Sequence, residues 1–506
     1  MIKQILDYFP QKKVYRFFEM IPGFLVWATL LGSVALSILN PLWAIYFIIA
    51  FDLYWLLRVA YLLIYLWLSW RRYRETVAQD WLNQVQTLPR WRDIHHLIFL
   101  PTYGEPLDVL RGSLNSLAKV RYPLERFIVV LAGEERDRAN FLKNAEVIQS
   151  EFGHRFGHFL ITLHPQDIIG EIAGKGANIN WAGHRAKELI DKLQLPYENI
   201  IVSSFDVDSC AHPDYFAYLT YVYLTQPDPL HSSYQPVAVY NNNIWNSPAV
   251  SRVVANSTTF WLLTDLARPE RLFTFSSHSM PFKALVDVGF WQNDIVTEDS
   301  RIFLQCFVRY NGNYRVTPLY LPISMDTVYA GSLWRSFVNQ YKQQRRWAYG
   351  VENFPYMAWH FWKSGAIPFT KKFRYLWNQL EGVYSWATAP LIIFILGRLP
   401  MELANDNVKS TMIAHNSPQA LKWLMTMAMV GLLFSAILST VLLPPKPREH
   451  HWVKYGAMLL QWLLFPFCMI IFGAIPATDA QTRLMLGKYL GFWVTEKQRE
   501  PKPATV

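Results

Sequence analysis

The stretch Asn199-Ile200-Ile201-Val202-Ser203-Ser204-Phe205-Asp206-Val207-Asp208 decides the fold and the kind of site that this chain carries. Its first half has the β-branched, uncharged composition of a buried strand in a parallel sheet. In an extended chain the side chains of Asp206 and Asp208 lie on the same side, so both carboxylates face one site. Such a pair predicts a site for Mg²⁺ or Mn²⁺, because these ions are held by one or two carboxylates together with substrate phosphates. A solvated turn is the alternative.

Three further uncharged strands precede this stretch and alternate with helices. The strands are expected at residues 96–100, 127–131 and 159–163, and the helices at 107–118, 138–150 and 177–193. This alternation is typical of a doubly wound α/β domain, in which ligands bind at the carboxyl ends of the strands. Glu105, Glu134 and the aspartate pair all follow strand ends, so we expect them to lie at one edge of the sheet.

Lys175 lies between Gly174 and Gly176 at the start of an expected helix. Backbone amides and an ammonium group can bind an anion together at such a position. A solvated lysine in a turn is the alternative, but the position relative to the strands favours a functional role.

The tripeptide Thr297-Glu298-Asp299 precedes another helical pattern. Thr297 is expected at the N-cap, with two acids in the first turn. These acids either complement the helix dipole or supply a catalytic carboxylate that faces a substrate hydroxyl.

A helix is also expected over residues 333–349, where Gln343, Arg346 and Trp347 fall at positions i, i+3 and i+4 on one face. An amide, a guanidinium and an indole on one stripe can bind a diphosphate and a sugar ring. The same residues can instead anchor a helix at a membrane surface.

Long apolar runs at both ends of the chain predict membrane-spanning helices. They cover residues 21–39, 42–70, 382–397, 423–443 and 455–478. Asp52 and Arg58 interrupt the second run, and we expect them to face the interior of the helix bundle or a polar path, because contact with lipid is costly. The first run lacks a signal-peptide cleavage site and is followed at once by a second span.

The apolar runs divide the chain into five expected parts. These are an N-terminal region with two spans (1–70), a globular domain (71–350), interfacial helices (351–381), a C-terminal membrane region (382–478) and a cytoplasmic tail (479–506). Basic residues flank the first hairpin of spans and predict a cytoplasmic globular domain in a multi-pass plasma (inner) membrane protein. They are Lys3, Lys12, Lys13, Arg16, Arg71, Arg72 and Arg74.

Composition narrows the classes of partner. The formal net charge of +10 suits anionic lipid headgroups and nucleotide phosphates, and no nucleic-acid-binding motif stands out. The three cysteines are widely separated and lack metal-binding spacing, so neither a disulfide framework nor a cysteine metal site is expected.

Five motifs occur in a familiar order, each of them weak alone. They are PTYGE (101–105), GKGANIN (174–180), FDVDS (205–209), TED (297–299) and QQRRW (343–347). With membrane spans on both sides, the sequence resembles the membrane-embedded family 2 glycosyltransferases, the group that contains cellulose, chitin and hyaluronan synthases. The resemblance implies a GT-A-type catalytic domain.

The resemblance also implies roles for individual residues. The nucleotide-sugar donor is expected to contact Tyr103, Glu105, Glu134, Lys175 and Asp206, and Asp208 is expected to bind Mg²⁺ or Mn²⁺ on the diphosphate. Asp299 is expected to be the general base, flanked by Glu298 and Thr297. Gln343, Arg346 and Trp347 are expected to bind the diphosphate and the acceptor end.

The function implied is inverting extension of a β-linked polysaccharide from a UDP-sugar, with or without translocation of the polymer through the spans. A non-processive transferase that acts on a glycolipid acceptor is the first alternative. A catalytically inactive membrane scaffold is the second, and the intact acidic set argues against it. The sugar and any accessory subunits are not assigned.

The sequence departs from the family pattern at two loops and leaves the span count open. Residues 132–135 read AGEE where the family often has paired aspartates, and residues 275–279 read FSSHS where cellulose synthases have F-x-G-[ST]. Three C-terminal spans leave the tail outside, yet its basic residues and the F-x-V-T-x-K segment at 492–497 favour the cytoplasm. Either the run that contains Pro466 is re-entrant or a short span lies near Tyr375.

Overall fold

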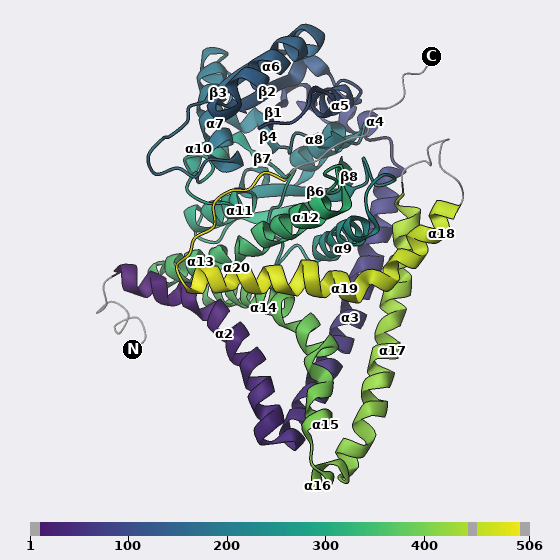
Figure 1. Ribbon diagram of the computed structural model, residues 1–506. Helices are drawn as coiled ribbons and strands as arrows, with labels where there is room; N and C mark the ends of the chain where they lie inside the picture. The colour runs from purple at the N-terminus through teal and green to yellow at the C-terminus, as the bar shows by residue number, and fades with distance from the viewer. Residues whose placement is uncertain (1–10, 444–452, 496–506) are drawn as a thin grey trace.

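The computed structural model describes residues 11–443 and 453–495. Figure 1 shows a sheet with helices packed around it at one end of the molecule, and a set of long helices that extends from it and converges at the far end. The eight strands have the order β3-β2-β1-β4-β7-β6-β8-β5. The prediction of an α/β domain joined to long apolar helices is confirmed.

The first half of the sheet is parallel. It consists of β1 (His95–Pro101), β2 (Phe127–Glu134), β3 (His158–His164) and β4 (Ile200–Ser204), with β1 in the centre. The connecting helices are α5 (Leu107–Leu117), α6 (Arg138–Phe152) and α7 (Lys175–Lys192), close to their predicted bounds. Strands β1, β2 and β4 are almost wholly buried, which explains their uncharged composition.

The second half of the sheet is mixed. Strand β7 (Ser279–Pro281) is antiparallel to both β4 and β6 (Ser232–Tyr240), β6 is parallel to β8 (Arg315–Met325), and β5 (Cys210–Ala211) is antiparallel to β8. The antiparallel strands have only two or three residues, too few for a periodic sequence pattern. The helices of this half are α8 (Tyr215–Thr225), α9 (Ala249–Leu266), α10 (Phe282–Asp287), α11 (Glu298–Arg309) and α12 (Leu333–Ala348).

The chain turns where the sequence suggested that it stays extended. Strand β4 ends at Ser204, and the Ser209 backbone N–H donates to the Asp206 carbonyl over 2.9 Å, which closes a turn around Val207. Asp206 and Asp208 therefore do not share one face of a strand. The expectation of a common face is wrong because the strand is shorter than its apolar composition suggested.

Four helices among the described residues are long and apolar enough to cross a membrane. They are α2 (Gln11–Leu39), α3 (Pro41–Val77), α17 (Met412–Val441) and the helical stretch Tyr455–Met485. A fifth candidate is α14 (Phe369–Phe394) together with residues 396–403, which include α15 (Leu399–Leu403), with a bend of 51° between its two parts. Residues 351–381, expected as interfacial helices, form α13 (Asn353–Lys363) and the first half of α14.

The helical stretch Tyr455–Met485 runs in a different direction from the other candidate spans. Figure 1 shows α19 (Phe465–Met469) and α20 (Ile475–Met485) lying across α2, α3 and α17 at the end nearest the sheet. Helix α20 contacts α2, α12 and α14. Arg345 of α12 donates to Asp479 of α20 over 2.9 Å, which ties the crosswise helix to the sheet domain. Hydropathy alone does not reveal this direction.

The remaining elements are short. They are α4 (Trp81–Gln86), α16 (Asp406–Lys409), α18 (Val453–Leu460), the 3-10 helices η1 (Trp91–Asp93), η2 (Leu124–Arg126), η3 (Glu135–Asp137), η4 (Tyr197–Asn199), η5 (Pro229–His231), η6 (Tyr349–Glu352), η7 (Leu396–Arg398) and η8 (Gln461–Leu464), and the π-helical turn η9 (Ile470–Ala474).

Gly23 permits the close crossing of α2 and α20. A Cβ atom at Gly23 would lie 2.7 Å from both the Gln481 carbonyl oxygen and the Met485 Cβ. We expect Gly23→Leu to destabilise the protein in detergent by about 1–3 kcal/mol, the usual cost of overpacking. Thermal unfolding followed by the loss of monodisperse protein measures the effect.

The matched control for this substitution is Gly32→Leu, in the same helix. A Cβ atom there meets nothing within 4 Å. Equal melting temperatures for the two variants would contradict the packing of α20 against α2.

Candidate active site

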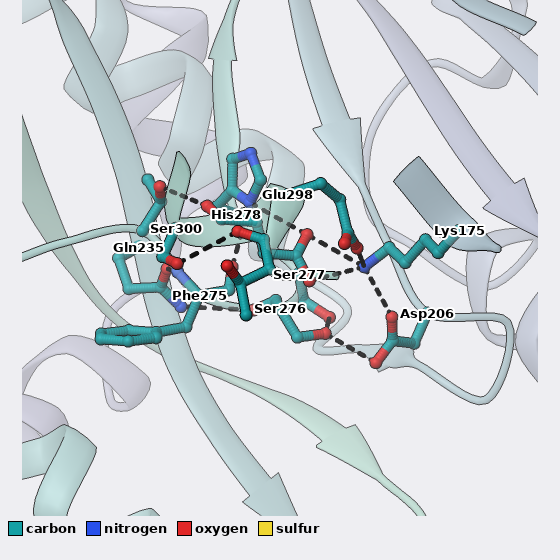
Figure 2. A network of polar contacts seen from close by, with 12 residues as sticks. Lys175, Asp206, Gln235, Phe275, Ser276, Ser277, His278, Glu298 and Ser300 are labelled. Atoms are coloured by element: carbon teal, nitrogen blue, oxygen red, sulfur yellow. Dashed lines mark hydrogen bonds and ion pairs between the residues drawn. The ribbon is translucent and has the colours of Figure 1, made fainter. Parts of the chain in front are cut away.

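The centre of the candidate site is an ammonium group held between two carboxylates. Lys175, the first residue of α7, donates from Nζ to Asp206 Oδ1 over 2.7 Å and to Asp299 Oδ1 and Oδ2 over 2.9 and 2.8 Å (Figure 2). The Lys175 side chain is 10% exposed. The fold thus joins three motifs that lie far apart in the sequence.

This ion-pair cluster fixes the charge of Lys175. Burial by itself lowers the pKa of the ammonium, but the carboxylates of Asp206 and Asp299 more than offset that effect and raise the pKa above its usual value. Lys175 is therefore cationic at every physiological pH. In this structure it contacts the two acids, a partnership that the sequence did not indicate.

Asp206 and Asp208 have separate surroundings. Asp206 also accepts a hydrogen bond on Oδ2 from the Ser276 hydroxyl, over 2.8 Å. Asp208 is 3% exposed and accepts on Oδ2 from the Asp326 backbone N–H over 2.8 Å. In residues 11–443 and 453–495, no group of three or more His, Cys, Asp or Glu side chains could hold a metal ion. A single carboxylate such as that of Asp208 suits an ion whose other ligands come from a bound phosphate and water.

Glu298 is the other acid of the cluster and is 1% exposed. Its Oε1 lies 3.9 Å from Lys175 Nζ, and its Oε2 has no hydrogen-bond partner in the described part of the chain. Burial, reinforced by the Asp299 charge and opposed by Lys175, raises the pKa of Glu298 to about 8. Glu298 is thus largely protonated at pH 7, while the neighbouring Asp299 accepts the hydrogen bonds of Lys175.

The raised pKa of Glu298 makes folding dependent on pH. Between the ordinary pKa of 4.5 and about 8 the folded protein binds more protons than the unfolded chain, so stability falls as pH rises through this window. We expect Glu298→Gln to reduce the change in the free energy of unfolding between pH 5 and pH 8 by more than about 1 kcal/mol. One pKa unit corresponds to about 1.4 kcal/mol. Melting temperatures at pH 5 and pH 8 measure it, and an unchanged slope would contradict a buried, protonated Glu298.

Thr297 takes the N-cap position of α11 but does not cap the helix with its side chain. Its hydroxyl donates to Glu352 Oε1 instead. Burial raises the pKa of the Glu352 carboxyl. A carboxyl that has lost contact with water needs a hydrogen-bond donor, and the Thr297 hydroxyl supplies one. Thr297 thus occupies the expected N-cap position, and its hydroxyl links α11 to the segment that follows α12.

The loop at residues 274–279 adds polar groups that were not among the predicted site residues (Figure 2). Thr274 Oγ1 donates to the Asp299 carbonyl over 2.6 Å, and His278 Nδ1 lies 3.0 Å from the Phe275 carbonyl and 3.8 Å from Asp299 Oδ1. Burial lowers the pKa of His278, so its ring is neutral at pH 7. Ser277, at the glycine position of the F-x-G-[ST] pattern, has φ +63°. The positive φ explains why glycine suits this position.

The predicted donor residues of the β1 and β2 ends also meet. Glu105 accepts on Oε2 from the Thr102 hydroxyl over 2.8 Å and from the Tyr103 backbone N–H over 2.6 Å, and burial raises its pKa to about 7. Glu134 accepts from the guanidinium of Arg136, which lies over the Tyr103 ring with Cζ 4.3 Å from the centroid. Arg136 was not anticipated, because nothing in its local sequence separates it from the nearby surface arginines.

Helix α12 places its predicted residues next to the cluster. Gln343 and Trp347 line a small cavity with Tyr240 and Asp326, and the Tyr240 and Trp347 rings lie 6.0 Å apart. The pKa of Tyr240 is raised, chiefly by burial and also by the charges of Asp206 and Asp208, whereas Arg346 lowers it. The charge of Arg346 also lowers the pKa of Glu298, against the larger effect of burial, and the buried Nε of Arg346 has no hydrogen-bond partner in the described residues.

The segment after α20 lies against the same helix. The Arg346 guanidinium is 4.8 Å from the Phe492 ring centroid, and Lys342 Nζ is 3.5 Å from that of Trp493. Phe492 also packs against Gly174, where a Cβ atom would lie 2.4 Å from its ring. Lys497 of the F-x-V-T-x-K segment and the basic tail residues Arg499 and Lys502 lie outside the described residues, as does Lys3.

Comparison with known proteins gives one family and several similar folds. Residues 201–476, more than half of the chain, match the family model described as glycosyl transferase family group 2. No curated protein sequence matches the chain. A mannosyltransferase, PcManGT from Pyrobaculum calidifontis in complex with GDP-Man and Mn²⁺, is 15% identical with a TM-score of 0.44, over 83% of this chain and 99% of that chain. S. aureus TarS 1–349 in complex with UDP-GlcNAc is 14% identical with a TM-score of 0.36, over 69% and 91%.

Proposed function

The chain belongs to glycosyl transferase family group 2 and is a glycosyltransferase, and from this premise we propose that it extends a β-linked polysaccharide from a UDP-sugar by inverting, metal-dependent transfer. The observation that carries the proposal is the convergence of Asp299, Asp206 and Lys175 beside Arg346 of α12. This arrangement provides a base and a cation-lined site for a diphosphate at one point. The kinship with cellulose, chitin and hyaluronan synthases is part of the proposal.

Asp299 acts as the general base in the proposed reaction. The acceptor hydroxyl attacks the anomeric carbon as the bond to the nucleoside diphosphate breaks, and the Asp299 carboxylate takes the hydroxyl proton. Lys175 holds Asp299 in place through two hydrogen bonds. One displacement without a covalent intermediate inverts the anomeric centre.

The leaving group needs positive charge around it. Asp208 would hold Mg²⁺ or Mn²⁺, which supplies Lewis-acid neutralisation of the diphosphate when bound, and Asp206 would contact the nucleotide. Arg346 stabilises the same developing charge, because its buried Nε, which has no hydrogen-bond partner in the described residues, can donate to a phosphate oxygen. Gln343 and Trp347, next to Tyr240, bind the acceptor end.

The membrane helices support a role at the lipid bilayer. We place spans at α2, α3, the bent pair α14 and α15, and α17, with the crosswise α19 and α20 at the interface (Figure 1). Four crossings put the sheet domain, the start of α2 and the segment after α20 on one side, and the basic residues in the first turns of α2 and the last turns of α3 favour the cytoplasm of a plasma membrane protein. This arrangement replaces the re-entrant run and the hidden span as the account of the topology.

Turnover with product analysis tests the function. Detergent-purified protein is incubated with a panel of UDP-sugars and Mn²⁺ or Mg²⁺, and UDP release and product size are measured. We expect release with one sugar and a product of many residues. Turnover that yields only a single-sugar glycolipid would contradict the polymerase proposal and favour the non-processive transferase.

A further inference from the structure

We propose that Arg136 determines which nucleobase the donor carries, and that it selects a base with a keto oxygen at pyrimidine C4 or purine C6, uracil or guanine, over cytosine or adenine. This inference rests on the proposed use of a nucleotide sugar and names a property of that donor site. Arg136 lies in η3, directly after β2, at the same edge of the sheet as Tyr103 and Glu105.

The guanidinium of Arg136 is fixed from two sides. Its Nε and Nη2 both donate to Glu134 Oε2, and its plane lies over the Tyr103 ring with Cζ 4.3 Å from the centroid. Glu134 is buried, whereas the Arg136 side chain is 32% exposed. The arginine is therefore held by a carboxylate behind it while part of its surface remains open to a ligand.

The loops that carry these residues are tied together. Asp137 Oδ2 accepts from the Gly104 backbone N–H over 2.8 Å, and Gly104 adopts φ +80°, a conformation that glycine reaches without strain. Asn144 of α6 donates to the Glu105 carbonyl over 3.5 Å. The end of β1 and the end of β2 thus form one unit that places a phenol ring, a guanidinium and the half-buried Glu105 at the same edge of the sheet.

This unit matches a keto base and mismatches an amino base. A guanidinium has five N–H donors and no acceptor, and Nη1 of Arg136 has no hydrogen-bond partner in the described part of the chain. These donors suit the O4 of uracil or the O6 of guanine. Cytosine and adenine place an amino group at the corresponding position, where donor would face donor, and such a mismatch discriminates strongly. The aromatic ring of Tyr103 offers a stacking face that any base can use.

Nucleotide binding without turnover tests the inference. Full-length protein in detergent with Mn²⁺ is titrated with UDP, CDP, GDP and ADP by calorimetry. We expect UDP to bind roughly 10-fold or more tighter than CDP, and GDP tighter than ADP, in line with the discrimination that one good side-chain-to-base contact provides. Arg136→Ala is expected to reduce the UDP-to-CDP ratio to less than about threefold.

The control is Arg138→Ala, two residues along the chain, where the arginine side chain is 61% exposed and pairs with Glu135. It should keep the wild-type ratio. Arg136→Lys retains the charge without the planar guanidinium, and we expect it to lose the preference for UDP over CDP as well. This variant separates base recognition from simple charge attraction. It also covers the case in which the alanine variant fails to fold.

An unchanged ratio in folded Arg136→Ala or Arg136→Lys would overturn the inference while leaving the glycosyltransferase function intact. A wild-type preference for CDP or ADP would also overturn it. No binding of any nucleoside diphosphate to wild-type protein would instead contradict the proposed donor class.

Discussion

Replacement of Asp299 by Asn is expected to lower the turnover number of sugar transfer by about 10²–10⁴-fold, the usual contribution of a positioned general base. The amide keeps the size of the side chain but cannot take the acceptor proton. Lys175 retains Asp206 as a partner at 2.7 Å, so the ammonium stays in place. Metal-dependent binding of UDP should persist, because Asp299 acts on the acceptor and not on the diphosphate. UDP release under saturating donor measures the loss.

Asp294→Asn is the matched control for this prediction. Asp294 precedes the same helix by a few residues, is exposed and bonds to Gln292 over 2.7 Å. It should leave turnover near the wild-type value. If Asp299→Asn turned over at the wild-type rate with an unchanged melting temperature, the assignment of the base would be wrong.

Replacement of Asp208 by Asn is expected to reduce turnover about 10²-fold or more, because the loss of one charged ligand removes several kcal/mol of charge stabilisation by the metal. The defect should have a distinct signature. The Mn²⁺ concentration for half-maximal activity should rise, and UDP binding should lose its dependence on metal. Asp299→Asn should show neither effect, so the two variants separate the metal ligand from the base.

The control for Asp208→Asn is Asp228→Asn, at an exposed carboxylate that pairs with His231. It should match wild-type protein in a titration with Mn²⁺. A normal Mn²⁺ dependence in folded Asp208→Asn would remove this residue from the metal site. Asp208 also accepts the Asp326 backbone N–H, so the melting temperature of the variant has to be compared with the wild-type value.

The strands that could be predicted from sequence are those with long, uncharged runs. Strands β1, β2 and β4 are buried on both faces, and burial of that kind excludes charge along the whole strand. Strands β5 and β7 have two and three residues and are held by pairing with distant strands, so no local pattern reveals them. The turn after β4 was not predicted either, because the apolar composition of the stretch continues past the end of the strand at Ser204.

The candidate site was predictable in composition and only partly in geometry. Motif order predicts that Lys175, Asp206 and Asp299 belong to one site, and the structure places the three side chains in contact. Which atoms bond was not predictable. The pairing of Lys175 with Asp299, the hydroxyl of Ser276 on Asp206 and the stacking of Arg136 on Tyr103 all join residues from separate loops.

The membrane region shows a different limit. Hydropathy shows that a helix is apolar but does not show its direction. From sequence, the stretch that contains Pro466 is therefore predicted as a span or a re-entrant run. Its crosswise course depends on tertiary contacts, including the Arg345 to Asp479 ion pair and the close approach of α20 to Gly23. Those contacts join segments more than a hundred residues apart in sequence.

The anomeric configuration of the product tests the central claim, a single displacement with Asp299 as base, most directly. Product formed by wild-type protein from an α-linked UDP-sugar is isolated, and the configuration of the new linkage is determined by NMR. The account predicts a β-linkage in every transferred residue. An α-linkage would require retention, and with it a mechanism that the present arrangement of Asp299, Lys175 and Asp206 does not describe.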